Sequence, residues 1–286
     1  MKMKWSVVRV LTTGLLLSGA SFIQAQSPEP PHLLRIFRED IKSGKNSAHE
    51  GVESAYVRAF SKSGYTSYLG LDAMTGTNQA WFLESYDSYE SMEKAIHLAE
   101  TEPLKSALAQ LDAQDGELRT GERGMVATYQ KDLSYLPVPS NLVKARYVNI
   151  MTMRVHPGHS EEFAEMRKLV NAAYAKSGNN LRRVVYSVSS GAPAGTYLVL
   201  SAMDSLKALD PPTPAMSMAD AFGDSLARYF KLQAEVVVSS ESTMFAVNPK
   251  MSNPPKEFVA ADPAFWAPKP KVAAVKPMPA KPAASQ

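Results

Sequence analysis

The sequence contains no cysteine, and its 286 residues include only five histidines and three tryptophans. Without cysteine the chain can form neither disulfide bonds nor a lipid anchor on an N-terminal cysteine, so packing alone must hold its core. A glycine-rich phosphate loop, a Walker motif and a Ser-His-Asp arrangement are also missing. Sequence motifs therefore assign neither nucleotide binding nor nucleophilic catalysis.

Both ends of the chain are basic, whereas positive and negative side chains nearly balance in the body between them. The formal net charge is +3, yet residues 1–26 carry three basic side chains and no acid, and residues 253–286 carry five lysines against two acids. The part between them is therefore slightly acidic. Binding of nucleic acid needs a basic face that neutralises phosphates, so no nucleic-acid partner is expected.

No apolar run in the sequence is long enough to span a bilayer comfortably. Residues 10–20 are apolar and follow three basic side chains, which is typical of a secretory signal peptide. We expect cleavage after Ala20 or Ala25, with Ala25 favoured because a polar segment follows it; an uncleaved anchor is the alternative. Export of a chain without cysteine fits a periplasmic or secreted bacterial protein with no transmembrane span after signal removal.

Two stretches of the chain share a pattern that ends in Lys-Ser-Gly, at Gly64 and at Gly178. Each of these glycines follows another glycine, Gly44 or Gly158, by the same twenty residues. The equal spacing predicts one structural unit present twice, as a tandem duplication. The predicted segments are a signal peptide (1–25), a first unit (32–131), a linker (132–144), a second unit (145–252) and a disordered tail rich in Pro, Ala and Lys (253–286).

Within each unit the apolar pattern predicts a strand, a helix, a hairpin of two strands, a second helix and a last strand. In the first unit, the stripe from Val52 to Phe60 repeats with helical spacing, and Gly64 is suited to end that helix. Residues 75–78 form the expected hairpin turn. The second unit repeats this order, except that the proline-rich residues 210–214 interrupt its second helix. The order is β-α-β-β-α-β.

In both units the third predicted strand runs directly into an Asp-Ser helix cap. Residues 81–89 read Trp-Phe-Leu-Glu-Ser-Tyr-Asp-Ser-Tyr, and residues 197–205 read Tyr-Leu-Val-Leu-Ser-Ala-Met-Asp-Ser. This pattern resembles the dimeric α+β barrel superfamily, which includes NIPSNAP-like proteins and antibiotic-biosynthesis-type monooxygenases. The resemblance implies an α+β fold of two tandem ferredoxin-like units whose sheets pack into one intramolecular barrel. It leaves pairing with a second copy, as a homodimer, open.

Strand alternation suggests which side chains face the barrel interior. Leu34, Ile36, Val148 and Ile150 are aliphatic in both units, so we expect them to face the helices. The residues that alternate with them along each strand then point inward. These residues include both apolar and polar side chains, as a small-molecule pocket requires. The alternative is that the charged members pair with each other or with Glu122 at the barrel rim. The predicted ligand-binding residues are Arg35, Phe37, Glu39, Trp81, Asn149 and Met151.

Histidine patterns give little support for a metal or a cofactor. His156 and His159 could share an ion with Glu162, but they lie on a predicted turn with no third histidine nearby. His49 and Glu53 can meet on one helix face. Haem-binding members of the resembled superfamily use an axial histidine, but no motif assigns that role here, and His49 is expected to face solvent. Neither a metal nor a cofactor is therefore predicted.

Three functional hypotheses follow. The first is an exported protein that binds a small apolar or aromatic ligand in the barrel. The second is a cofactor-independent monooxygenase or isomerase-like enzyme, in which Arg35, Asn149 and Trp81 hold an enolate-like substrate and the arginine stabilises the developing oxyanion. The third is an envelope-associated structural protein whose basic tail makes a weak contact with an anionic surface.

Overall fold

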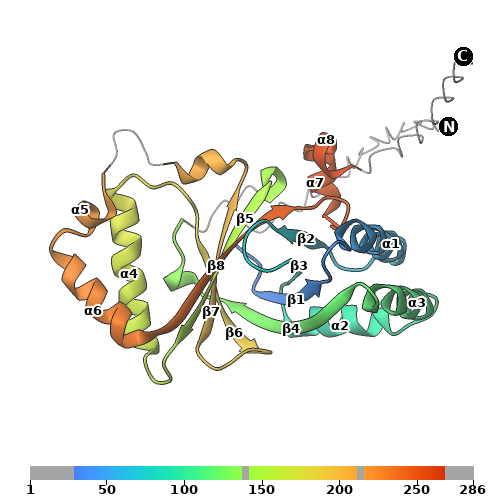
Figure 1. The fold of residues 1–286 in the computed structure, drawn as a ribbon, viewed down its shortest axis with the longest axis horizontal. Coiled ribbons are helices and arrows are strands. Elements are labelled where there is room, and N and C mark those ends of the chain that lie inside the picture. The colour runs from blue at the N-terminus through green and yellow to red at the C-terminus, as the bar shows by residue number, and fades with distance from the viewer. Residues whose placement is uncertain (1–28, 137–141, 211–215, 268–286) are drawn as a thin grey trace, which may run out of the picture.

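The computed structural model describes residues 29–136, 142–210 and 216–267. The predicted signal peptide, part of the predicted linker and the end of the predicted tail lie outside these residues. Helices stand at the two ends of the molecule with a curved sheet between them (Figure 1). In the part of the chain that the structure describes, no helix has both the length and the apolar character needed to cross a membrane.

The two halves of the chain have the same order of elements, as the sequence predicted. The first half consists of β1 (Leu33–Ile41), α1 (Asn46–Ser63), β2 (Tyr68–Ala73), β3 (Gln79–Tyr86), α2 (Tyr89–Ala99), α3 (Leu104–Gly116) and β4 (Arg119–Tyr129). The second half consists of β5 (Tyr147–Val155), α4 (Ser160–Lys176), β6 (Val184–Ser190), β7 (Thr196–Met203), α5 (Met218–Phe222), α6 (Leu226–Val236) and β8 (Val237–Val247).

The eight strands form one closed antiparallel barrel in the order β1-β3-β2-β8-β5-β7-β6-β4. Each half contributes a four-stranded sheet, and the halves are joined by hydrogen-bonded seams between β2 and β8 and between β4 and β6. Gly191 lies at the second seam with a φ of 87°, where an added Cβ would stand 2.1 Å from the carbonyl oxygen of Gly124. The predicted single intramolecular barrel of two ferredoxin-like units is thus confirmed.

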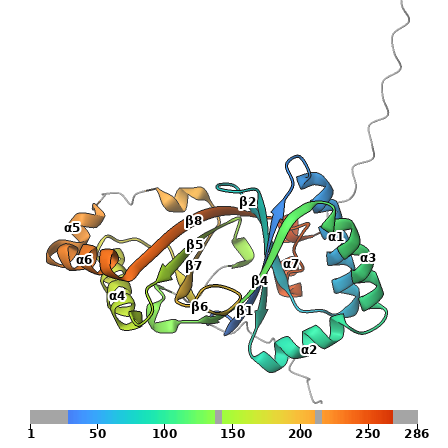
Figure 2. The ribbon, with the colours of Figure 1, turned by 60° about the horizontal axis from the view of Figure 1, so that its bottom comes forward.

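Helices cover the outer face of the barrel on both sides. Figure 2 shows α1 and α3 beside the first half and α4 with α6 at the opposite end. Gly64 ends α1 in the left-handed region with a φ of 73°, as predicted. At its other end α1 begins after Lys45, and no side chain caps it by a hydrogen bond. In α2 the cap is Ser88, whose side chain accepts from the backbone of Ser91.

The barrel interior is filled by aliphatic and aromatic side chains from both halves. Leu34 and Ile36 of β1 belong to the same buried cluster as Val148 and Ile150 of β5. The expectation that these four residues face the helices is therefore wrong. These four side chains are at most 4% exposed. The more apolar face of β1 and of β5 therefore lies in the barrel, and the more polar face lies under the helices.

The predicted disordered tail begins too early at residue 253. Two short helices, α7 (Lys256–Ala261) and α8 (Pro263–Trp266), dock on the body. Phe258 and Trp266 are buried and join the interior cluster, and the Trp266 Nε1 donates to the carbonyl of Val143 at 2.8 Å. Two buried aromatic side chains supply the apolar area that a Pro/Ala/Lys-rich segment otherwise lacks.

Candidate functional site

A cavity of about 470 Å³ lies between the outer face of the first half-sheet and helices α1, α2 and α3. This volume falls in the range of about 300–1,000 Å³ that is usual for small-molecule pockets. Aromatic side chains from β1, β2, β3 and α1 form much of its wall, and aliphatic side chains of α2 and α3 line another part. The aromatic lining residues are Phe37, Tyr56, Phe60, Tyr65, Tyr68 and Phe82.

Acidic groups outnumber basic ones in the lining by six to three. A cleft lined by one sign of charge concentrates ions of the opposite sign and repels those of the same sign. The cavity therefore favours a neutral or cationic occupant over an anionic one. The acidic lining residues are Glu39, Glu53, Glu84, Glu100, Asp112 and Glu122, and the basic ones are Arg35, Lys105 and Arg119.

One polar group of the lining is centred on Glu84 of β3. Its carboxylate is buried, accepts hydrogen bonds from the hydroxyls of Tyr65 at 3.0 Å and Tyr86 at 2.9 Å, and pairs with Arg35 at 3.5 Å. Burial raises the pKa of Glu84, and the charge of Arg35 opposes that rise. The Arg35 guanidinium also lies 4.5 Å from the centre of the Phe37 ring. Arg35 is therefore held by its own neighbours.

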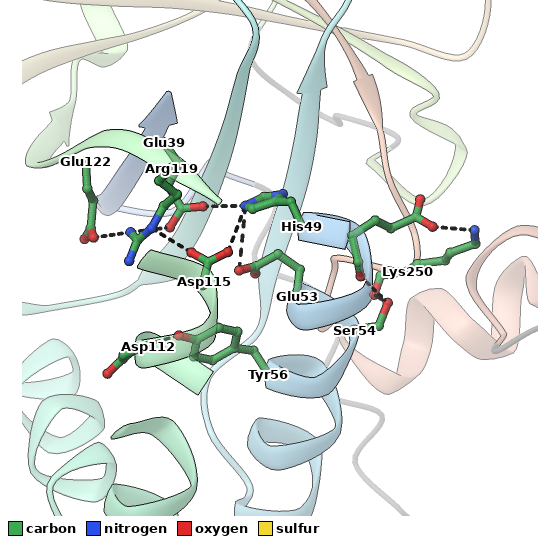
Figure 3. Close-up of polar contacts among 11 residues, drawn as sticks. Glu39, His49, Glu53, Ser54, Tyr56, Asp112, Asp115, Arg119, Glu122 and Lys250 are labelled. Carbon is green, nitrogen blue, oxygen red and sulfur yellow. Dashed lines mark hydrogen bonds and ion pairs between the residues drawn. The ribbon is translucent and has the colours of Figure 1, made fainter. Parts of the chain in front are cut away.

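A second polar group, at another part of the cavity, brings together Glu39, His49, Glu53, Asp115 and Arg119 (Figure 3). The His49 Nε2 lies 2.7 Å from Glu39 Oε2, 3.6 Å from Asp115 Oδ1 and 3.9 Å from Glu53 Oε1. The Arg119 Nη1 donates to Glu39 Oε1 at 2.9 Å, and its Nε lies 2.7 Å from Asp115 Oδ2. Four elements, β1, α1, α3 and β4, thus converge on one buried polar cluster.

The buried carboxyls of this cluster lie close enough together to raise one another's pKa. Burial raises the pKa of Glu53 well above its usual range, and the charges of Glu39 and Asp115 raise it further. Burial, together with the charge of Glu39, raises the pKa of Asp115 to about 6, against the opposing effect of His49 and Arg119. The site is therefore one in which an additional positive charge would be stabilised.

Tyr68 supplies a hydrogen-bonding group that no described residue uses. Its side chain lines the cavity, and its buried hydroxyl has no hydrogen-bond partner among the described residues. Burial raises the pKa of this hydroxyl, with the charges of Glu53 and Glu84 adding to the effect. A buried hydroxyl without a partner costs about 1–3 kcal/mol. A ligand that accepts or donates one hydrogen bond here would recover part of that cost.

The six predicted ligand-binding residues do not form one site. Arg35, Phe37 and Glu39 line the cavity, but on the helix side of β1 rather than in the barrel. Trp81 lies in the barrel interior against Phe245, with a ring-centre separation of 5.2 Å. Met151 packs in the cluster under α4 and α6, and Asn149, of the same parity on β5, accepts a hydrogen bond from Ser242. A role of the first three in ligand binding stays a prediction.

His49 was expected to face solvent, yet only 2% of it is exposed. The four-residue spacing of His49 and Glu53 was a usable signal for one face of α1. Nothing in the sequence marked Asp115 or Arg119, because they lie on distant elements and reach the cluster only through the sheet and α3. Among the described residues, the group of Glu39, His49, Glu53 and Asp115 is the one set with metal-ligand geometry. The turn with His156 and His159 forms no such set.

No protein-family model and no curated protein matches this sequence. Solved structures do match the fold. A candidate monooxygenase from Fusobacterium nucleatum subsp. nucleatum aligns with a TM-score of 0.50 and 11% identity over 76% of this chain and 93% of its own. An anthrone oxidase-like protein aligns with a TM-score of 0.51 and 17% identity over 77% of this chain and 93% of its own. At such identities the likeness establishes the fold, a closed barrel with two ferredoxin-like halves, and nothing finer.

Proposed function

We propose that this protein binds a small aromatic molecule, neutral or cationic, in the cavity under α1, α2 and α3. The observation that carries the proposal is a cavity of about 470 Å³ with aromatic walls and a buried hydroxyl, that of Tyr68, to which no described residue is hydrogen-bonded. Ligand pockets combine apolar walls with a few such polar groups that fix orientation. The site differs from the barrel interior that the sequence predicted, but the class of ligand is similar.

The charge of the lining narrows the ligand class. Arg35 and Arg119 are already paired with Glu84, Glu39 and Asp115, so neither is free to hold an anionic group. A cation over an aromatic face gains about 0.5–2 kcal/mol, and the acidic excess adds to that attraction. A protonated aromatic amine therefore fits better than an aromatic acid of the same size.

A thermal-shift screen with matched aromatic amines, neutral aromatics and aromatic acids tests this proposal. Ala109 and Ala113 lie one turn apart on the exposed side of α3, but only Ala109 lines the cavity. We expect amines to raise the melting temperature of the wild type and of Ala113→Trp, but not of Ala109→Trp. Equal shifts for the two tryptophan variants, or a preference for the acids, would contradict the proposal.

A second candidate is an enzyme that oxidises or isomerises the bound compound. The names of two solved structures with this fold, the candidate monooxygenase and the anthrone oxidase-like protein, favour it. The predicted trio cannot hold one substrate, because Arg35, Trp81 and Asn149 lie under the first-half helices, in the barrel and on the second half. Oxygen uptake and product analysis with each compound from the screen test this candidate, with Ala109→Trp as the control.

We also propose that the protein is exported, that its basic tail contacts the cell envelope, and that its two halves arose by duplication. The basic and apolar N-terminal pattern supports export to a bacterial periplasm, and cell fractionation tests it. For envelope contact the informative deletion is 268–286, since α7 and α8 belong to the folded body; unchanged fractionation would count against contact.

The repeated element order supports a duplication and a NIPSNAP-like ancestry. Light scattering tests pairing into a homodimer.

A further inference from the structure

We propose that Glu39, His49, Glu53 and Asp115 form a binding site for a divalent first-row transition-metal ion, such as Mn²⁺, Fe²⁺ or Zn²⁺. The proposal goes beyond the binding of an organic ligand and does not depend on it. All four residues are buried, and one ligand atom from each lies within 4.8 Å of the others. Three carboxylates and one imidazole are a donor set that these ions accept, whereas Ca²⁺ and Mg²⁺ prefer oxygen alone.

The distances suit a single ion at the centre of the set. Ions of this class hold nitrogen and oxygen ligands at about 2.0–2.2 Å, which places neighbouring ligand atoms about 3–4 Å apart. The His49 Nε2 lies 3.6 Å from Asp115 Oδ1 and 3.9 Å from Glu53 Oε1, while its distance of 2.7 Å to Glu39 Oε2 must widen by a few tenths of an ångström.

Arg119 divides the carboxylate oxygens into an outer and an inner set. It holds Glu39 Oε1 and Asp115 Oδ2, and the other oxygens of these two residues, Oε2 and Oδ1, are left facing His49. Metal ligands are commonly oriented by such outer contacts, which turn one oxygen toward the ion. As Figure 3 shows, Arg119 approaches the cluster from the side opposite His49.

An unpartnered oxygen gives independent support for a missing cation. Asp115 is only 1% exposed, and its Oδ1 has no hydrogen-bond partner among the described residues. This oxygen is the one turned toward His49 and Glu53. A buried carboxylate oxygen without a donor is costly, and coordination to an ion would satisfy it.

The placement of the ligands on regular elements favours a preformed site. His49 and Glu53 stand one turn apart on α1, Glu39 is on β1, and Asp115 is in the last turn of α3. Glu39 and Glu53 also line the cavity, so a bound ion would lie at its wall. The competing arrangement is a protonated His49 that shares ion pairs with Glu39 and Asp115 and binds no metal.

Metal analysis of the untagged protein distinguishes the two arrangements. After removal of metals with a chelator, we titrate the protein with MnCl₂ or ZnCl₂ in a calorimeter, with no organic compound present. We expect about one ion per chain, and affinity lower by at least about 10-fold in Asp115→Asn and His49→Gln. The matched control is His97→Gln, because His97 is an exposed histidine beside Glu93 and Glu100. Its affinity should equal that of the wild type.

Wild-type protein that takes up no ion, or an equal loss of affinity in His97→Gln and His49→Gln, would overturn the proposal. If the buried variants fail to fold, the visible absorption of bound Co²⁺ and the X-ray absorption of bound Zn²⁺ in the wild type decide the matter. One imidazole nitrogen with oxygen ligands supports the site, and coordination by oxygen alone overturns it. Failure of the thermal-shift screen affects neither measurement, so the two proposals are tested separately.

Discussion

The pair of Arg35 and Glu84 gives the sharpest test of how charge is balanced in the cavity. Replacing Arg35 with Met removes the cation that opposes the raised pKa of Glu84 while leaving a side chain of similar length. The pKa of the buried carboxyl should then rise further. Because Tyr65 and Tyr86 still donate to Glu84, the fold should survive and the effect should appear as a change in stability with pH.

The magnitude follows from the geometry of the pair. An adjacent opposite charge favours the ionised carboxyl and lowers its pKa. The separation here is 3.5 Å, and 27% of the Arg35 side chain is exposed, so solvent screens the pair in part and its loss should cost about 1 kcal/mol. For a folded body of this size that loss lowers the melting temperature by about 2–4 °C.

The sign of the pH dependence is fixed by linkage. A carboxyl with a raised pKa in the folded state binds more protons when folded than when unfolded, so stability falls as the pH rises above the usual glutamate range. The extra loss in Arg35→Met should therefore be absent near pH 4 and develop as the pH rises through the raised pKa of Glu84. Urea unfolding of both proteins from pH 4 to pH 8 measures it.

A second replacement separates this electrostatic effect from lost packing. In Arg35→Met/Glu84→Gln the carboxyl is gone, so the pH-dependent part of the loss should disappear while any packing loss remains. A difference between wild type and Arg35→Met that is the same at pH 4 and pH 8 would refute the reasoning. So would an identical pH dependence in the single and double variants.

Three further predictions concern the barrel and its cover. Gly191→Ala should destabilise the protein by several kcal/mol more than Gly44→Ala in urea unfolding, since both glycines have positive φ but only at the former would the new Cβ meet backbone. Trp81→Ala should cost about 3–5 kcal/mol by the same measurement, because the ring is buried in the barrel; a smaller loss would indicate an interior that is not packed. Ending the chain after residue 267 should leave the melting temperature unchanged, whereas ending it after residue 253 should lower it, because α7 and α8 bury two aromatic side chains.

Local patterns in the sequence were sufficient for the order of elements. Gly64 has no Cβ and therefore adopts the left-handed conformation without strain, so it ends α1 regardless of the tertiary packing. Alternation in residues 33–39 and the turn at 75–78 likewise depend on neighbours in sequence. The element order then restricts each half to a four-stranded sheet with helices on one face, which leaves the other face to be covered by the second half.

The direction in which each strand faces was decided only by the tertiary structure. Both faces of β1 carry apolar residues, Leu34 and Ile36 on one and Phe37 on the other. The sequence of the strand alone therefore does not determine which face lies inside the barrel. Closing the barrel buries one face of the sheet, while the helices leave a cavity on the other face of the first half. The more aliphatic face of β1 therefore lies in the interior, and the face that carries Arg35 and Glu39 lies under the helices.

The sequence by itself determined the repeated β-α-β-β-α-β order and hence the type of barrel, because helix ends, turns and periodicity are set by near neighbours. It did not determine the candidate metal site. His49 and Glu53 were visible one turn apart, but Asp115 joins them from α3, more than fifty residues away, and only the packing of that helix on the sheet brings it there. Burial of His49 follows from the same packing, and burial is what gives the cluster its electrostatic character.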